Sequence, residues 1–489
     1  MMFPKHSNPT RPRQDTKNRT EQWAHAPYNF VPLPETIVPA PRPLPDHNAY
    51  YREAAGYHTG WIECDLETMS PTYIRGMLTE TVWKQHRTKQ EAGEDLDPRE
   101  KEEAAPFFSI GGEEIEGREV PVPRIPGSSL RGMIRMLVEI VGYGRVRWVG
   151  NEPTITFRAF APPSIRTGQG PDLADAIFGW VEEKGVREEW VWGPQQPARA
   201  GRVFFGDAHF EGASDGVWYA SPNQTITPRI LGQPKPTTFQ HYLVQAHGRG
   251  HTPDNKSTLA HYGTPTPDET VIRGHKLYWH KGAEPDIKAT AKELERKPDS
   301  SERKRESQLT SITPLRPGVH FRFRIAFENL RDEELGALLW TLALPGEPGK
   351  AYYHKLGMGK PLGMGAVKVT PHLYTTDREA RYQHLFAGEG WAEAVREADI
   401  QPFIECFDQF VRDQIGSGTA RLADEERIQM LLAMLEWREG TNSWRDLTRY
   451  MEIEYGPRKL NEYKERPVLP DPLAVSGRPS NRVGPSVLT

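Results

Sequence analysis

Two segments that combine glycine with basic residues constrain this chain more than any other feature. The first reads PGSSLRGMIR at residues 126–135 and opens a predicted helix. The second reads KLGMGKPLGMG at residues 355–365 and leads into a predicted strand. Glycine leaves backbone N–H groups accessible, and such groups beside cations bind phosphate without reading the attached base. Together the two segments predict a chain that binds an RNA backbone.

The composition limits where such binding could occur. The chain has 489 residues, of which 26% are charged, and its formal net charge is −4. A uniformly basic coat is therefore excluded, and we expect any RNA contact to be confined to a groove or stripe. The length gives room for about two to four domains, or for one core with large insertions.

The cysteines and the hydropathy indicate a reducing, aqueous compartment. Only Cys64 and Cys406 are present, far apart in sequence, which predicts neither a disulfide scaffold nor a cysteine zinc site. No apolar run reaches the length of a membrane span, and the first residues lack the hydrophobic region of a signal peptide. We therefore expect a cytoplasmic protein with no membrane partner.

Composition divides the chain into five parts. Residues 1–50 are polar and then proline-rich, which favours an extended arm that lies on its own domain or on a neighbour. We expect the folded core in two pieces, 51–210 and 311–374, separated by a thumb-like insertion at 211–310. Residues 375–489 are predicted to be a C-terminal helical region and tail.

Hydrophobic periodicity predicts an α+β fold. Apolar residues from Leu130 to Val141 share one helical face, while residues 319–327 alternate as a strand does. Asp332 is the expected N-cap of a second helix. The predicted order is strand 62–66, helix 128–141, strands 154–161, 202–210 and 319–327, the helix after Asp332 and strand 366–370, then helices 402–415 and 424–439. This order predicts a ferredoxin-like, RNA-recognition-type βαββαβ core with large insertions and a C-terminal helical segment.

The start of the first predicted helix carries the first group of candidate RNA-binding residues. Ser128 is a natural N-cap, but a cation in the first turn and a like charge one turn later are each mildly unfavourable. An anion over the helix terminus would remove both penalties. Glycine within the helix costs about 1 kcal/mol relative to alanine, so we expect close packing at Gly132. An ordinary capped helix with solvated arginines explains the pattern equally well. The candidates are Gly127, Ser128, Ser129, Arg131 and Arg135.

The second glycine segment carries the next group. It is not a Walker A loop, because Gly-Lys is followed by proline and no helix follows, and its glycine spacing is not the dinucleotide fingerprint. Four glycines and two lysines can still form a nest of donors for phosphates. The alternative is a flexible hairpin turn. The candidates are Lys355, Gly357, Gly359, Lys360, Gly363 and Gly365.

Further cations are weaker candidates. Arg322 and Arg324 alternate with aromatic residues on a predicted strand, a pattern that most often places solvated charges opposite a core face. Lys235 and Lys276 belong to the histidine-containing insertion, which resembles a cationic, aromatic finger for RNA. The histidine spacing matches no standard zinc pattern, so no metal site is expected there.

Catalytic residues are scarce in this sequence. No Gly-x-Ser-x-Gly, His-Glu-x-x-His or cysteine–histidine pattern is present. Asp95 and Asp97, in the acidic segment before the first helix, are the candidates for binding Mg²⁺ or activating a 2′-hydroxyl. The alternative is a solvated acidic loop.

The two glycine segments together resemble the RAMP superfamily of CRISPR-associated proteins. Residues 125–135 are similar to the Pro-Gly-Ser-Ser-Leu-Lys/Arg-Gly signature at the start of the family's first helix, and 355–365 to its glycine-rich loop before the last strand. Further motifs of this chain resemble those of a type III-D-associated subgroup. They are residues 27–33 (PYNFVPL), 201–208 (GRVFFGDA), 234–239 (PKPTTF), 274–279 (GHKLYW), 328–330 (ENL) and 334–339 (ELGALL). The resemblance covers about residues 27–370.

This resemblance implies a backbone subunit of a type III CRISPR effector complex. Such a subunit grips the guide RNA, positions target RNA and stacks beside sibling RAMP subunits; active members cut the target with an aspartate and a divalent cation. Here the family's short aspartate loop is replaced by a long acidic stretch, so cleavage is implied less directly than RNA binding. A catalytically inactive scaffold, or a nucleotide-binding α+β enzyme that uses residues 355–365, are the alternatives.

Overall fold

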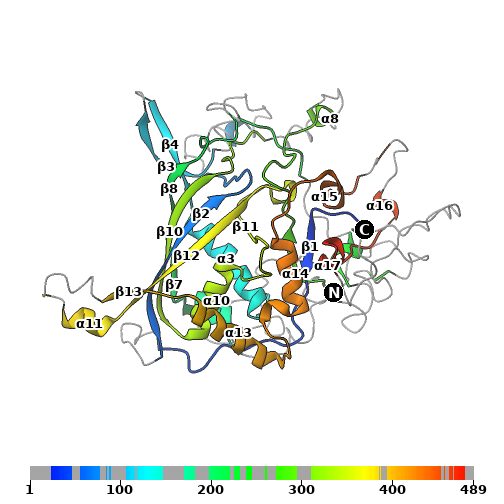
Figure 1. Ribbon diagram of the computed structural model, residues 1–489. Helices are drawn as coiled ribbons and strands as arrows, with labels where there is room; N and C mark the ends of the chain where they lie inside the picture. Colours follow the sequence, from blue (N-terminus) through cyan, green and yellow to red (C-terminus); the bar gives the residue numbers. More distant parts are fainter. Residues whose placement is uncertain are drawn as a thin grey trace.

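The computed structural model describes most of the chain in separate stretches (Figure 1). The described residues are 24–46, 56–76, 84, 87–89, 106–115, 118–146, 170–181, 198–220, 225–231, 238–244, 259–260, 271–294, 310–384, 386, 394–452, 456, 462–465 and 467–478. The predicted strand at 154–161 and the candidates Asp95, Asp97 and Lys235 lie outside these ranges.

An antiparallel sheet forms the centre of the molecule, and with its helices it confirms the α+β prediction. Among the described strands the order is β11-β12-β2-β10-β8-β4-β3, with β13 also paired to β12 and β7 to β10. The bounds are β2 His58–Thr68, β3 Ser109–Ile115, β4 Arg118–Ile125, β7 Val203–Phe205, β8 Ala208–Ala213, β10 Val319–Leu330, β11 His354–Lys355, β12 Ala366–Thr376 and β13 Val395–Ala398.

The predicted strands are largely present, with altered limits. The strand at 62–66 lies inside β2, and β10 extends the one predicted at 319–327. The stretch at 202–210 is interrupted between β7 and β8. In β10, residues 319, 321, 323, 325 and 327 are buried while 320, 322, 324 and 326 are exposed, as the alternation predicts for a half-buried strand.

Helices cover one face of this sheet (Figure 1). α3 (Gly127–Val141) and α10 (Asp332–Ala343) bury apolar residues in the same hydrophobic cluster as β2, β10 and β12. Both N-caps differ from the predictions. Pro126 precedes α3 and no side chain caps it, so Ser128 lies within the helix. Arg331 is the N-cap of α10, and its backbone N–H donates to Glu334, so Asp332 is the first helical residue instead.

A buried ion pair fixes the start of α10 beneath the sheet. The Arg202 guanidinium donates to both carboxylate oxygens of Glu334, and also to the carbonyl oxygens of Ala176 and Asn329. Both charged side chains are almost completely buried, at 0% and 1% exposure. Arg202 thus joins three segments of the chain. Since all of its partners belong to the chain itself, its buried charge is explained without a ligand.

The N-terminal segment lies on its own chain, one of the two possibilities predicted for an arm. β1 (Tyr28–Val31) pairs antiparallel with β9 (His275–Tyr278), which comes from the predicted insertion. All four residues of β1 are buried. The other short elements are α6 Leu173–Phe178, β5 Gly179–Trp180, β6 Arg199–Ala200, α7 Phe239–Tyr242 and α8 Ala291–Leu294.

The C-terminal region packs into the main core. The predicted helices appear as α13 (Gln401–Ile415) and α14 (Glu426–Leu435), the latter shorter than expected. A Cβ atom at Gly336 of α10 would overlap the Phe403 carbonyl oxygen of α13, so the glycine permits close helix packing. The smaller elements are η4 Lys360–Leu362, α11 Arg378–Gln383, η5 Leu422–Asp424, α15 Asn442–Leu447, α16 Glu462–Glu465 and α17 Pro472–Val475.

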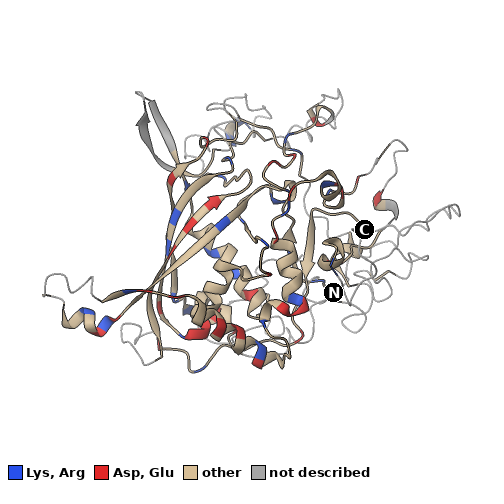
Figure 2. Cartoon of the chain, viewed as in Figure 1, with Lys and Arg blue, Asp and Glu red and all other residues tan. Residues whose placement is uncertain are grey.

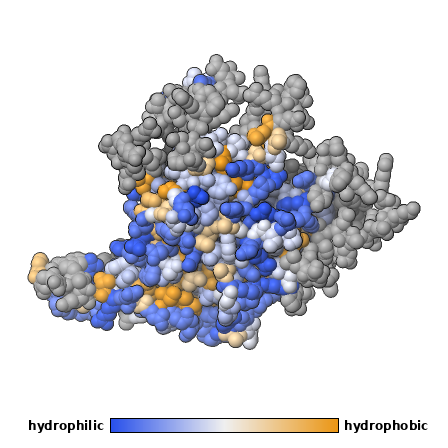
Figure 3. All heavy atoms as spheres, turned by 45° about the horizontal axis from the view of Figure 1, so that its top comes forward, coloured by the Kyte–Doolittle hydropathy of each residue, from blue (hydrophilic) through white to orange (hydrophobic). Residues whose placement is uncertain are grey.

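The outer edge of β12 is only partly paired. On the side of β12 that faces away from β2, β11 pairs with residues 366–367 and β13 pairs with residues 373–376. Residues 368–372 therefore have no strand partner on that side among the described residues. Pro371 lies in this gap. Figure 3 shows a mainly hydrophilic surface on the face that it turns forward, with apolar residues in small groups.

Candidate nucleic-acid interface

The start of α3 is closed by the chain itself. The backbone N–H of Gly127 donates to Asp207 Oδ1 at 2.8 Å, so a carboxylate already occupies the positive end of the helix dipole. A Cβ atom at Gly127 would overlap the Phe205 carbonyl oxygen. Close backbone approach thus explains this glycine without a ligand. Ser128 is exposed and Ser129 is half-buried.

Two candidate arginines of α3 bind the end of α6. Arg131 donates to the Phe178 carbonyl oxygen at 2.6 Å, and Arg135 donates to that of Gly179 at 3.2 Å and to Glu139 at 3.0 Å. Both guanidinium groups lie over the Phe178 ring, at 5.5 and 5.8 Å from its centroid. Burial, with the neighbouring charge of Arg135, lowers the pKa of Arg131. These contacts offset the unfavourable placement of two cations at the start of the helix. From the sequence alone, a bound anion was a candidate for that role.

The close packing expected at Gly132 is absent. This residue is exposed, and a Cβ atom placed on it would meet no atom of the described chain within 4 Å. The prediction was therefore wrong, and the helix carries the conformational cost of this glycine without a packing gain.

The second glycine segment, residues Lys355–Gly365, forms a tightly packed structure that we call the glycine loop. Gly357, Gly359, Gly363 and Gly365 all have positive φ angles, from 67° to 101°. A Cβ atom at Gly365 would overlap the Leu356 carbonyl oxygen. The predicted glycine positions are thus required by backbone conformation and close contact. The loop connects β11 to β12, which pair antiparallel, so the hairpin of the alternative interpretation is present and its turn is tightly packed.

Two lysines bind the carbonyl side of the glycine loop. Lys355 is buried and donates from Nζ to the carbonyl oxygens of Gly363 and Met364, both at 3.2 Å. Lys281 donates to the Pro361 carbonyl oxygen at 2.9 Å. Burial, together with the charges of Lys281 and Lys360, lowers the pKa of Lys355 well below its usual range. Lys355 therefore faces its own loop, while Lys281, which sequence reasoning missed, comes from the insertion.

The opposite side of the loop is accessible. Met358 is 52% exposed at its tip. The N–H groups of Met358, Leu362, Gly363, Met364 and Gly365 have backbone acceptors. Those of Gly357, Gly359 and Lys360 have none within the described residues. Burial lowers the pKa of the Lys360 amine, which is half-buried beside them.

The structure does not bring the two glycine segments together. The start of α3 lies beside Gly206, whose N–H donates to Arg324 O in the middle of β10. The glycine loop instead binds Pro71 and Tyr73, beyond the ends where β2 and β10 meet at Thr68 and Val319. Five residues of β10 separate the two levels, or about 17 Å along the strand. The two glycine segments therefore lie at different levels of the sheet.

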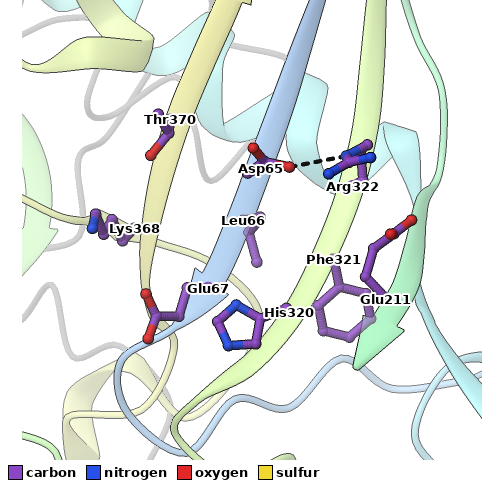
Figure 4. Close-up of a pocket in the computed structure, with 9 residues that line it drawn as sticks. All are labelled: Asp65, Leu66, Glu67, Glu211, His320, Phe321, Arg322, Lys368 and Thr370. Atoms are coloured by element: carbon purple, nitrogen blue, oxygen red, sulfur yellow. Dashed lines mark hydrogen bonds and ion pairs between the residues drawn. The ribbon is translucent and has the colours of Figure 1, made fainter. Parts of the chain in front are cut away.

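The remaining arginine candidates, Arg322 and Arg324, are exposed side chains of β10. Basic and acidic residues both occur along the strands of this sheet (Figure 2). Arg322 donates to Asp65 at 2.9 Å and Arg324 to Glu63 at 3.1 Å. The hydrogen bond that Arg322 donates to Asp65 raises the pKa of Arg322. Beside this pair a shallow hollow of about 310 Å³ opens between β12, β2, β10 and β8 (Figure 4); it is lined by Asp65, Leu66, Glu67, Glu211, His320, Phe321, Arg322, Lys368 and Thr370. Acids and bases alternate across it, so it presents no net cationic surface.

Lys276 is enclosed by tyrosines. Its Nζ lies 3.9 Å from the Tyr28 ring centroid and donates to the Tyr242 hydroxyl at 2.9 Å, and the Tyr278 ring is also near. Burial lowers the pKa of this amine to about 8. Because Tyr28 belongs to β1, this part of the insertion is attached to the N-terminal segment and does not protrude as a finger.

The described residues contain no group of three or more His, Cys, Asp or Glu side chains arranged to hold a metal ion. In the same part of the chain, no helix combines the length and the apolar character needed to cross a membrane.

Comparison with known proteins identifies the family. No curated protein matches the chain. Similar solved structures include a "Type IV-B CRISPR Complex" (13% identity, 64% of this chain and 90% of that chain, TM-score 0.26) and Csc2 of Thermofilum pendens (13%, 79% and 92%, 0.29). A third is the "Type III-B Cmr-beta bound to cognate target RNA" (15%, 64% and 59%, 0.23). Residues 65–368, which include both glycine segments, match the RAMP superfamily. The chain therefore belongs to the RAMP superfamily.

Proposed function

We propose that this chain is an RNA-binding subunit of a type III CRISPR ribonucleoprotein, similar to those of type III-D, that grips the guide RNA through its phosphates. Membership of the RAMP superfamily supports the class of partner. The observation that carries the proposal is a set of three backbone N–H groups without a described acceptor, those of Gly357, Gly359 and Lys360, in half-buried residues around the exposed tip of the glycine loop. Such donors bind phosphate irrespective of base sequence.

We further propose that the core is ferredoxin-like. The chain order β2, α3, β7–β8, β10, α10, β12 follows the βαββαβ pattern, and the sheet order β12-β2-β10-β8 places the first and third strands in the centre. In this core α3 follows the first strand and the glycine loop precedes the last. Target RNA and sibling RAMP subunits are the other partners of this proposal.

Lys360→Ala tests the phosphate contact. Because Arg131 is bound to the end of α6, replacing it would disturb the fold, so the single lysine variant is the cleaner choice. We expect weaker guide-RNA binding for every sequence tried, and a slope of log affinity against log salt that is reduced by about 0.7 per lost contact. Fluorescence anisotropy at several salt concentrations measures both quantities.

Lys350→Ala is the matched control. Lys350 is an exposed lysine ten residues before Lys360 in the sequence, and its Nζ pairs with Glu347 at 2.7 Å. It is expected to leave affinity and slope unchanged. If Lys360→Ala behaves like the control, the glycine loop is not the phosphate site. Sequencing RNA that co-purifies with the chain tests the CRISPR assignment, since guide RNA carries a repeat-derived end.

Target-RNA cleavage is a separate proposal that rests on Asp95 and Asp97. Both aspartates belong to the acidic stretch before α3, which stands in place of the family's short aspartate loop. We expect Asp95→Asn or Asp97→Asn, or removal of Mg²⁺, to abolish cutting by the assembled complex while guide binding persists. Unchanged cleavage products in all three cases would make this subunit a scaffold.

A further inference from the structure

We infer that the C-terminal helix α15 positions the glycine loop through an intervening segment, Trp279–Pro285, which we call the brace. This inference rests on the proposed function for its consequence in RNA binding, but the physical coupling can be tested without RNA. It assigns a role to part of the C-terminal region, which lies beyond residues 65–368 of the family match.

The brace lies directly on the glycine loop. A Cβ atom at Gly363 would be 2.8 Å from Cβ of both Lys281 and Pro285, which leaves no space between the two segments. The Lys281 amine adds its hydrogen bond to the Pro361 carbonyl oxygen. The brace therefore contacts the loop on its carbonyl side, opposite the accessible N–H groups.

α15 holds the brace from the other side. The indole N–H of Trp444 donates to the His280 carbonyl oxygen at 2.7 Å, and Arg445 donates to that of Glu284 at 2.9 Å. The Trp444 ring also meets the Trp279 ring edge to face, with centroids 5.2 Å apart. These contacts fix both ends of the brace to one short helix.

The chain before α15 packs against the brace with no space to spare. A Cβ atom at Gly282 would lie 2.6 Å from the backbone nitrogen of Gly440, and one at Gly440 would overlap the Lys281 carbonyl oxygen. Gly282 has a φ angle of +80°. Since the backbones approach closely at this crossing and the Lys281 and Pro285 side chains pack directly on Gly363, a displacement of α15 moves the brace, and the brace moves the loop.

Hydrogen exchange of the glycine-loop amides tests the coupling directly in the full-length chain. The N–H groups of Met358 and Gly365 donate to Tyr73 and Pro71, so their exchange reports loop opening. We expect Lys281→Met and Arg445→Ala each to accelerate exchange of these two amides about tenfold, the effect of losing one strong hydrogen bond.

Arg421→Ala is the matched control for Arg445→Ala. Arg421 also donates to a distant carbonyl oxygen, that of Gly346 at 3.3 Å, but it does not contact the brace. It should leave exchange at Met358 and Gly365 unchanged. Equal exchange in wild type, Lys281→Met and Arg445→Ala, or equal acceleration by Arg421→Ala, would overturn the inference.

Guide-RNA binding measured on the same variants separates the two proposals. The brace variants should weaken binding several-fold, although the side chains replaced point away from the accessible face of the loop, while Arg421→Ala should not. If exchange accelerates as expected but RNA affinity does not change, the brace exists and the loop is not the RNA site. If the wild-type chain binds no guide RNA, the proposed function fails and the exchange result still decides the brace.

Discussion

Raising the pH from 7 to about 9.5 is expected to stabilise the folded chain through Lys281. Burial, reinforced by the charge of Arg229, lowers the pKa of this amine from 10.5 to about 7. In the unfolded chain the amine has its ordinary pKa, so between these two values the unfolded state binds more protons than the folded state. The free energy of unfolding therefore rises with pH across this window.

The magnitude follows from the size of the pKa change. A fall from 10.5 to about 7 corresponds to at most ~5 kcal/mol over the whole window, at about 1.36 kcal/mol for each pKa unit. Lys281 is only partly buried as a residue, and water around its side chain screens the effect. We expect ~2 kcal/mol of added stability between pH 7 and about 9.5.

Urea unfolding of wild type and Lys281→Met at several pH values measures this contribution. Methionine fills a similar volume but cannot titrate, so subtracting its unfolding free energy from that of wild type removes the effect of other groups, such as the buried tyrosines. We expect this difference to shift in favour of wild type by ~2 kcal/mol as pH rises. A difference that stays constant, or shifts the other way, would refute the argument that burial makes the charged form of Lys281 unfavourable in the folded chain.

The remaining predictions concern the fold and the metal requirement. Arg202→Met should lower the unfolding free energy by about 3–5 kcal/mol, because Glu334 is left buried and unpaired. The double variant Arg202→Met/Glu334→Leu should recover most of this loss. Urea titrations that give the single and the double variant the same loss of unfolding free energy would contradict this. Gly132→Ala should stabilise the chain by about 0.5–1 kcal/mol, and Gly365→Ala should destabilise it by at least ~2 kcal/mol because of its positive φ and the overlap it creates; thermal melts that shift in the same direction would exclude this. Chelating divalent cations should leave guide-RNA affinity unchanged, since amides and ammonium groups bind phosphate without a metal; anisotropy in EDTA checks this, and a large loss would point to a bound ion.

Periodicity predicted the main elements well because burial decides them. The alternation in β10 and the apolar face of α3 follow from one buried side each, which is a local property of the sequence. The caps were less predictable. Ser128 and Asp332 are good capping residues, but Pro126 and Arg331 occupy the cap positions. The shifts, of two residues at α3 and one at α10, are set by tertiary packing.

The candidate site was harder to predict, because glycine and cation patterns do not reveal what they contact. Gly127 and Gly365 are required by close approach of the chain to itself. Lys355, Arg131 and Arg135 bind carbonyl oxygens of their own chain, a use of positive charge that sequence alone does not distinguish from phosphate binding. Lys281 carried no signal, since it becomes relevant only where two distant segments meet. RNA contact by these residues stays a prediction.

Pro371 has a consequence for how copies or relatives of this chain could lie next to one another. Proline is tolerated in a sheet where its nitrogen faces away from a neighbouring strand, because it has no hydrogen to donate. The unpaired stretch of β12 thus lacks a donor near its middle and makes a poor template for an incoming strand. A neighbouring molecule would therefore gain few backbone hydrogen bonds by adding a strand along this stretch of β12.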